Sequence, residues 1–393
     1  MVREYLEQNV YEALMDRFKL LFEEFDNIYV SFSGGKDSGL LLNLVLDYRN
    51  KYYPQKSIGV FHQDFEAQYT VTTEYIERTF EKIKDQVEPY WVCLPMATRT
   101  ALSSYEMFWY PWDDKKQELW VRDMPKHDYV INLENNPIRT YRYKMHQEDL
   151  AKQFGRWYRV AHGTKKTVCL LGMRADESLQ RYSGFLNKKY NYKDECWISK
   201  QFKDVWCASP LYDWSTNDIW HAYAVFGYDY NELYDLYYKA GLKPSQMRVA
   251  SPFNDYSKDS LNLYRVIVCY YVKAQDEYII VDGFHRYRVI TEHKDIYERE
   301  HGMLPVSVIN KPIDQRMAST IRHNRARGSH DVDLMSNIVK ELHELGRSDA
   351  WISKHLGMDK DEILRLKQIT GLAALFKDVK FGKAWVPTEE EEQ

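Results

Sequence analysis

Hydrophobic positions follow a helical period at the start of the chain and a strand-like pattern soon after. Leu6, Val10, Leu14, Phe18, Leu21 and Phe22 lie at helical spacing, which predicts an amphipathic helix over residues 5–25. Short apolar runs then predict strands at 27–32, 57–62, 90–94 and 167–173, with a helix after the first strand and another near 69–84. Strands that alternate with helices indicate an α/β fold with a parallel sheet.

The rest of the chain departs from this alternation. Residues 100–160 are aromatic and charged, fit no simple unit and are expected to form an insertion. Helical spacing returns after Leu211 and ends near Gly241. Paired strands are then expected at 264–273 and 278–282, and three helical stretches from residue 332 onward.

Composition narrows the class of protein. The 393 residues carry 54 Lys and Arg against 58 Asp and Glu, so any contact with nucleic acid needs a local basic patch. Because no apolar run approaches about 18 residues and MVREYLEQNV lacks a signal-peptide core, we expect a cytoplasmic protein with no membrane partner. Five cysteines, never in a CxxC pair, disfavour disulfides and metal clusters and are expected to be buried small hydrophobic residues.

A glycine loop joins the first expected strand to its helix. In the run Ser33-Gly34-Gly35-Lys36-Asp37-Ser38, glycines let N–H groups face an anion, the serine hydroxyls can donate, and Lys36 and the helix N-terminus add positive charge. The spacing differs from that of the GxxxxGK[ST] loop. The alternative is an ordinary glycine turn before a capped helix, but six such residues between strand and helix favour a phosphate-binding loop.

A second basic cluster follows the strand at 167–173. The guanidinium groups of Arg174 and Arg181 can bind a sulfate or a second phosphate through paired hydrogen bonds, with Glu177 orienting one of them. The alternative is a surface ion-pair network. Ligand sites form at strand ends in α/β folds, and this position therefore favours ligand binding.

These motifs resemble the PP-loop ATP pyrophosphatase superfamily, whose SGGxDS loop matches residues 33–38. The segments 172–178 with Arg181, 210–214 (PLYDW) and 218–220 (DIW) resemble the phosphoadenosine phosphosulfate (PAPS) reductase branch, and residues 244–248 extend the likeness to the IbrA-like family. The resemblance covers about residues 5–255. It implies ATP or PAPS as ligand with Mg²⁺, catalysis by Lys36 and Asp37, and nucleotide contacts from Ser33, Gly34, Gly35, Lys36, Asp37, Ser38, Asp64, Arg174, Glu177, Ser178 and Arg181.

The chain differs from PAPS reductases in a residue that their reaction requires. PAPS reductases use a cysteine in an ECGxH-type motif near the C-terminus, and this chain has no cysteine after Cys269. Thiol-dependent reduction of PAPS is therefore disfavoured. Cleavage of ATP or a sulfonucleotide at the α,β-phosphoanhydride remains, with transfer of an adenylyl or sulfur-containing group to an acceptor.

Two further basic clusters follow strand-like segments in the second half. The runs DGFHR at 282–286 and HNRAR at 323–327 suggest a second phosphate site and resemble the ParB/sulfiredoxin fold, in the IbrB-like form. Phe284 replaces the sulfiredoxin cysteine, which disfavours that chemistry. A basic edge that faces nucleic acid is the alternative. The resemblance implies a site for CTP or ATP built by Gly283, His285, Arg286, Asn324 and Arg327.

Residues 348–367 have the form of a helix-turn-helix, with Ser348 as cap and Gly357 at the turn. Lys360, Arg365 and Lys367 are placed to meet DNA phosphates. A plain helical hairpin is the alternative, because acidic residues weaken the basic face.

We therefore expect an α/β protein in four parts: a PAPS reductase-like parallel-sheet PP-loop domain at 1–255, an α+β ParB/sulfiredoxin-like domain at 256–330, a helix-turn-helix at 331–381 and an acidic tail at 382–393. Two functions remain open. One is an enzyme of the ATP pyrophosphatase or sulfonucleotide transferase class. The other is a nucleotide-gated, DNA-binding transcriptional co-activator of the prophage-regulating kind, without turnover. A homodimer is compatible with either.

Overall fold

The computed structural model describes residues 2–100, 107–186, 191–239, 242–244, 247–251, 267–272, 277–282, 287, 306–308, 376 and 379–388. The chain divides into two compact units. The first comprises Met1–Tyr234, Arg248–Ser257 and Leu372–Gln393, and the second comprises Asp235–Met247 and Lys258–Gly371. The two units are described separately.

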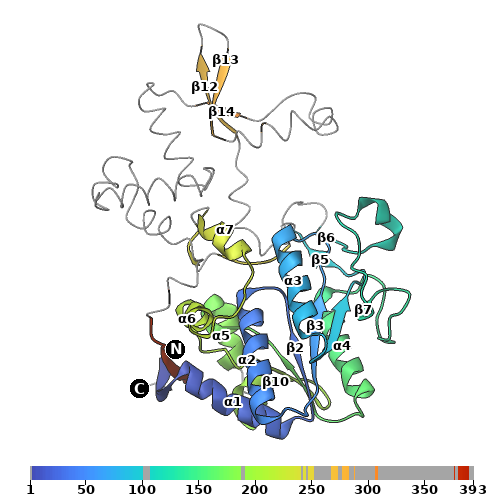
Figure 1. The fold of residues 1–393 in the computed structure, drawn as a ribbon, viewed down its shortest axis with the longest axis vertical. Helices are drawn as coiled ribbons and strands as arrows, with labels where there is room; N and C mark the ends of the chain where they lie inside the picture. Colours follow the sequence, from blue (N-terminus) through green and yellow to red (C-terminus); the bar gives the residue numbers. More distant parts are fainter. Residues whose placement is uncertain are drawn as a thin grey trace. The chain divides into compact units, whose positions relative to one another are not determined.

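An eight-stranded sheet forms the centre of the first unit (Figure 1). Neighbours are parallel from β7 to β11, whereas β10 and β9 are antiparallel additions. The central strands β3 and β8 are almost entirely buried, as expected of a parallel sheet covered on both faces. The predicted parallel α/β sheet is confirmed. The strand order is β7 (Val130–Ile131), β4 (Glu88–Val92), β3 (Ile58–Gln63), β2 (Asn27–Ser31), β8 (Thr167–Leu170), β11 (Val205–Ala208), β10 (Glu195–Phe202) and β9 (Asn191–Tyr192).

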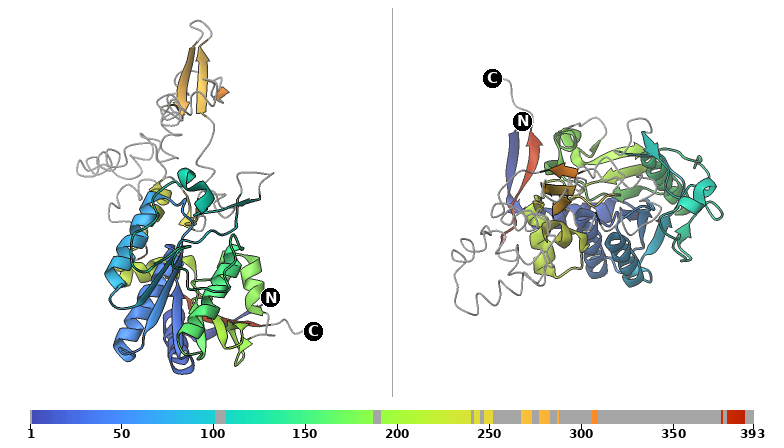
Figure 2. Two further views of the ribbon diagram at one scale, coloured as in Figure 1. Left: turned by 90° about the vertical axis from the view of Figure 1, so that its right-hand side faces the viewer. Right: turned by 90° about the horizontal axis from the view of Figure 1, so that it is seen from above.

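Helices cover the two faces of this sheet (Figure 2). On one side lie α2 (Lys36–Tyr52) and α3 (Thr70–Ile83), and on the other lies α4 (Gln147–Ala161). Leu150, Phe154 and Tyr158 recur at four-residue spacing on α4 and join a buried cluster with Tyr29 and Phe61 of the sheet. The first unit also contains η2 (Ala175–Glu177), α5 (Leu179–Leu186) and α6 (Thr216–Phe226). The division between the two units, after Tyr234, falls within α7 (Leu233–Lys239).

The stretch expected to be an insertion belongs in part to the core of the first unit. It contains β6 (Phe108–Trp109), which pairs with β5 (Thr98–Arg99) just before the stretch, and η1 (Asp114–Leu119). It also supplies β7, the edge strand of the main sheet, and α4, which leads into β8. The prediction of an insertion is therefore wrong for these two elements, because β7 is too short to show a strand period in the sequence.

The two ends of the chain pair with each other. β1 (Val2–Asn9) is antiparallel to β15 (Lys383–Thr388), and the two strands lie side by side in Figure 2. The first helix, α1, spans Val10–Glu24 rather than 5–25, because Asn9 caps it by accepting hydrogen bonds from the backbone of Tyr11 and Glu12. Residues 383–388 of the expected acidic tail are a strand, and residues 389–393 lie outside the described residues.

The second unit contains a three-stranded sheet in the order β13 (Glu277–Asp282), β12 (Ile267–Val272) and β14 (Val306–Val308). β12 and β13 form the predicted antiparallel pair, and β14 is parallel to β12. The helical stretches expected from residue 332 lie outside the described residues, as do all the residues predicted to bind a second nucleotide or DNA: Gly283, His285, Arg286, Asn324, Arg327, Lys360, Arg365 and Lys367.

The described part of the chain bears on two predictions, one about membrane-spanning segments and one about the cysteines. None of its helices combines the length and apolar character that crossing a membrane requires. The four cysteines whose side chains are described are free; Cys93 and Cys169 are buried, and Cys196 and Cys207 are partly exposed. Burial raises the pKa of the Cys93 and Cys169 thiols well above the ordinary value. These two thiols are therefore inert packing groups at neutral pH.

Candidate functional site

The glycine loop connects β2 to the N-terminus of α2, as its sequence predicts. Gly34 has φ +77°, a left-handed conformation that glycine adopts without strain. A Cβ at this position would lie 2.9 Å from the side chain of Ile76 on α3. Gly35 is the N-cap of α2 and makes no side-chain capping bond, and the first amide of the helix, that of Lys36, donates to the Tyr234 hydroxyl. A helix N-terminus that follows a glycine turn is an arrangement at which many proteins bind anions.

Two serine hydroxyls close the loop on itself. The oxygens of Ser33 and Ser38 lie 2.9 Å apart, and the Ser33 amide donates to the Ser38 hydroxyl at 3.1 Å. Ser38 in turn donates to the Gly35 carbonyl at 3.1 Å. The hydroxyls thus hold the loop in shape, and they lie where they can turn toward a ligand.

Lys36 is buried at the start of α2, with a side chain only 6% exposed. Its ammonium lies 2.8 Å from the carboxylate of Asp37 and 5.6 Å from the centre of the Tyr234 ring. Burial lowers the pKa of Lys36 below its ordinary value, while Asp37 acts to raise it. A buried ammonium at a helix N-terminus is an unfavourable charge in the absence of an anion, so this position is suited to a phosphate.

Asp37 joins the loop to the second basic cluster. Its carboxylate accepts from Arg174 Nε at 2.6 Å as well as from Lys36. Burial acts to raise the pKa of Asp37, but Arg174 and Lys36 outweigh it and hold that pKa at about 2. Arg174 also pairs with Asp176 and donates to the Trp214 carbonyl at 3.1 Å. The predicted loop and the predicted arginine cluster therefore form one charge network.

Glu177 contacts two arginines next to this network. Its carboxylate pairs with Arg181 and lies 3.5 Å from Arg248, which also donates to the Glu177 backbone carbonyl at 3.0 Å. Ser178 follows as the C-cap of η2 and accepts a hydrogen bond from the Arg181 amide at 3.2 Å. The orienting role expected of Glu177 fits this arrangement, and the structure adds Arg248 to the site.

Asp64 occupies a different environment from the loop residues. Its side chain is fully buried, and both of its oxygens accept from Arg122 at 2.6 Å. The indole of Trp91 donates to it at 2.6 Å, and the Glu66 amide at 2.7 Å. Burial raises and Arg122 lowers its pKa, which lies below the ordinary value overall. These internal partners indicate a residue that positions the segment after β3.

Three residues outside the predicted binding set contact the loop or lie close to it. The Tyr234 hydroxyl accepts from the Lys36 amide at 2.9 Å, and Asn231 donates to the Gly34 carbonyl at 3.0 Å. Gly172 approaches so closely that a Cβ there would lie 2.7 Å from backbone atoms of Asp37 and Ser38. The glycine was visible as part of the 172–178 motif, whereas Asn231 and Tyr234 carry no local signal.

The C-terminal strand packs on the segment that holds Arg174. The indole of Trp385 donates to the Asp213 carbonyl at 3.2 Å, and the Trp385 carbonyl accepts from the Tyr212 hydroxyl at 2.6 Å. The Phe381 ring packs edge-on against Trp214 with the centroids 5.5 Å apart. The PLYDW motif therefore contacts the arginine cluster on one side and the end of the chain on the other.

Comparison with known proteins agrees with this architecture. The sequence profile of the phosphoadenosine phosphosulfate reductase domain matches residues 27–241, and the chain belongs to that family. An IbrB-like C-terminal HTH domain matches residues 330–378, and a domain of unknown function matches residues 241–271. The chain thus combines a PAPS reductase-like PP-loop domain, of the nucleotide-binding class, with a helix-turn-helix domain.

Two relatives from one organism match the chain. The Escherichia coli (strain K12) protein YbdN is 33% identical over 263 residues, which is 66% of this chain and 62% of YbdN. YbdM of the same organism is 52% identical over 106 residues, 27% of this chain and 51% of YbdM. The chain thus spans only about three fifths and about half of the lengths of these relatives.

Solved structures show more distant likeness. The FMN adenylyltransferase of Candida glabrata, in complex with FAD and inorganic pyrophosphate, matches with a TM-score of 0.35 and 15% identity, covering 63% of this chain and 66% of that one. The phosphoadenylyl-sulfate reductase of Candida auris, in a phosphate complex, matches with a TM-score of 0.33 and 15% identity, covering 62% and 89%.

Proposed function

We propose that the first unit binds ATP or a sulfonucleotide at the Ser33–Ser38 loop and cleaves it at the α,β-phosphoanhydride, passing an adenylyl or sulfur-containing group to an acceptor. The observation that carries this proposal is the buried network Lys36–Asp37–Arg174 at the N-terminus of α2. It sets two cations beside the first amides of the helix, where charge on a departing pyrophosphate would be stabilised.

The carboxylate of Asp37 affects how a nucleotide can bind at the loop. In the described structure it pairs with both Lys36 and Arg174. An arriving phosphate competes with Asp37 for both cations, so nucleotide binding is favourable only if Asp37 keeps one of its partners. We propose that Arg174 keeps Asp37 while the Lys36 ammonium turns to the phosphates, because Arg174 is held by three other acceptors: Asp176, the Trp214 carbonyl and Thr216.

Mg²⁺ is expected to accompany the nucleotide. Among the described residues, no group of three His, Cys, Asp or Glu side chains is placed to hold a metal ion. Mg²⁺ that accompanies a nucleotide is usually bound by phosphate oxygens and water. We assign Mg²⁺ no protein ligand and derive no step from it.

The experiment is pyrophosphate release from ATP or PAPS with Mg²⁺, combined with calorimetry of binding. Lys36→Met should reduce ATP affinity by about 1.5–3 kcal/mol, roughly 10- to 150-fold, because one charge-assisted phosphate contact is lost. Lys51→Met is the matched control, since Lys51 lies exposed on the last turn of the same helix. Equal ATP affinity in folded Lys36→Met and wild type would contradict the assignment of the loop.

A second candidate function is nucleotide-gated DNA binding without turnover. Two observations favour it: the helix-turn-helix match at 330–378, and the return of the chain onto the PLYDW segment directly after it. Binding at Arg174 would thereby alter the PLYDW segment, which contacts the strand that follows the matched residues. ATP binding without pyrophosphate release would support this candidate over the enzyme.

Fluorescence anisotropy on mixed DNA fragments, with ATP, CTP or no nucleotide at fixed salt, tests the candidate. We expect a coupling of about 1–3 kcal/mol between nucleotide and DNA. Arg286→Ala should abolish the effect of CTP, whereas Lys367→Ala should weaken DNA binding under all conditions and flatten its salt dependence. Absence of DNA binding at low salt would refute this second candidate.

A further inference from the structure

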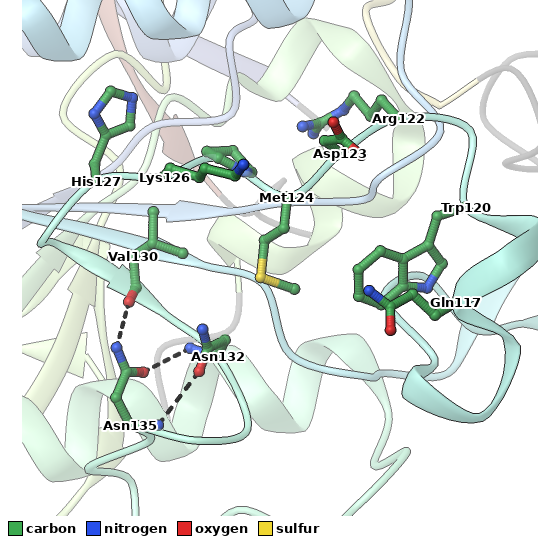
Figure 3. Close-up of a pocket in the computed structure, with 11 residues that line it drawn as sticks. Gln117, Trp120, Arg122, Asp123, Met124, Lys126, His127, Val130, Asn132 and Asn135 are labelled. Carbon is green, nitrogen blue, oxygen red and sulfur yellow. Dashed lines mark hydrogen bonds between the residues drawn. The ribbon is translucent and has the colours of Figure 1, made fainter.

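A pocket of about 560 Å³ opens beside β7, in the region between η1 and the turn that follows that strand. None of its lining residues belongs to the glycine loop or to the arginine cluster. Figure 3 shows Lys126 and His127 toward one side, Trp120 and Gln117 toward the other, and Met124 between them. Asn132 and Asn135 form its base. The volume lies within the range of small-molecule sites.

The wall of this pocket is held in place by buried carboxylates. Glu66, which is 5% exposed, accepts from the amides of Trp112 at 2.8 Å and Val121 at 3.0 Å. Arg122 donates to the Glu66 carbonyl at 2.9 Å and to both oxygens of Asp64. The segment that carries Trp120 and Arg122 is thus fixed to the end of β3 before any ligand arrives, which lowers the entropic cost of binding.

Backbone strain accompanies this wall. Glu66 has φ +59° and Trp112 has φ +54°, left-handed conformations that side-chain-bearing residues seldom adopt. Such conformations persist where surrounding contacts over-determine them, and they concentrate at ligand sites. The Glu66 carboxylate accepts from the Trp112 amide, so this contact joins the two strained residues and holds them in their conformations.

The groups that face the pocket define the chemistry of its ligand. Hydrogen-bond donors come from Lys126 and the amides of Gln117 and Asn132, against one lining carboxylate, Asp123. Arg122 also lines the pocket, but it already donates to Glu66 and Asp64. Lys126 makes no ion pair with any part of the chain that the structure describes. Trp120 offers a ring, held edge-on to Trp112 at 5.0 Å, and Met124 offers a polarisable apolar contact.

From these features we infer that the pocket is a second ligand site, which takes a small organic anion with a planar unsaturated ring. The anionic group meets Lys126 and Asn132, and the ring lies between Trp120 and Met124. A lone inorganic anion would leave most of the volume unfilled. This inference stands apart from the proposed function, because it requires neither nucleotide binding nor turnover at the Ser33–Ser38 loop.

The test is calorimetry of the full chain with 2-naphthoate and phenyl phosphate as probes, and with neutral 2-naphthamide and inorganic phosphate as comparison compounds. We expect at least one probe to bind with 1:1 stoichiometry and to bind at least tenfold more weakly to Lys126→Met. Lys116→Met is the matched control: Lys116 is exposed on η1 and does not line the pocket. Trp120→Leu should weaken 2-naphthoate but leave inorganic phosphate unchanged.

Three outcomes would overturn the inference: neither probe binds, inorganic phosphate binds as tightly as the probes, or Lys126→Met binds like wild type. Loss of probe binding in Lys36→Met would also overturn it, because the probes would then occupy the glycine loop. If the Lys36→Met variant no longer binds ATP but still binds the probe, the pocket and the glycine loop are separate sites.

Discussion

The ion pair between Arg17 and Asp213 offers the sharpest test of how the site is supported. Arg17 projects from α1 and meets both oxygens of Asp213 at 2.7 Å, and it donates to the Pro210 carbonyl at 2.8 Å. The two side chains are 8% and 0% exposed. The pair therefore anchors the PLYDW segment, whose Trp214 carbonyl holds Arg174.

The magnitude follows from what each substitution leaves behind. Asp213→Leu leaves a buried guanidinium without its carboxylate, and Arg17→Met leaves a buried carboxylate without its partner. Each should reduce the free energy of unfolding by about 3–5 kcal/mol. In the double variant no unpaired charge remains, and the main loss is the partner of the Pro210 carbonyl, about 1–3 kcal/mol. The double variant should therefore be more stable than either single variant.

Amide hydrogen exchange of β2 and β8 is the assay, because these central strands report unfolding of the first unit rather than of the whole chain. Glu81→Gln serves as control: it removes an exposed pair with Lys84 at 2.7 Å and should leave the exchange unchanged. Additive losses in the double variant, or a loss below about 1 kcal/mol in the single variants, would refute the coupling of this buried pair.

Three further predictions follow from the site, and one from the cysteines. Gly172→Ala should weaken ATP binding by shifting the start of α2, since the added Cβ would lie 2.7 Å from backbone atoms. Gly184→Ala is the control and should bind ATP like wild type, because the space around Gly184 is open. Equal calorimetric ATP affinities of the two variants would argue against the close packing at Gly172. ATP affinity should begin to fall with rising pH below 10.5, because burial lowers the pKa of Lys36 and the ammonium is lost early, while Lys36→Met should show a flat profile there. The stabilisation from Asp37 is present above its ordinary pKa of 3.8 and is lost as the pH falls toward about 2. In acid unfolding, the difference in free energy of unfolding between wild type and Asp37→Asn should therefore disappear at the lowest pH. A variant without cysteines should keep its nucleotide turnover, and sulfite release from PAPS that depends on Cys196 or Cys207 would contradict this.

The sequence alone was sufficient for the local features of the site. The strand at 27–31, the turn at Gly34 and the start of α2 are set by residues that are neighbours in the chain, through apolar runs and a position that requires φ > 0. The same holds for the parallel pairing of the central strands, because strands that alternate with helices have few other arrangements. The positions of Arg174 and Glu177 after β8 were equally readable, since ligand residues of α/β folds follow strand ends.

Only the tertiary structure decided which groups complete the site. Arg248 reaches Glu177 across 71 residues of chain, and Tyr234 reaches the Lys36 amide across 198. The pairing of β1 with β15 joins the two ends of the chain, and neither strand is recognisable without its partner: β1 resembles the start of a helix, and β15 lies in a segment that resembles a solvated tail. Asp64, which the motif predicts beside a nucleotide, has partners that the motif does not show: Arg122 and Trp91, 58 and 27 residues away along the chain. Such contacts depend on the packing of segments that are distant in the sequence, and a local pattern of residues cannot predict that packing.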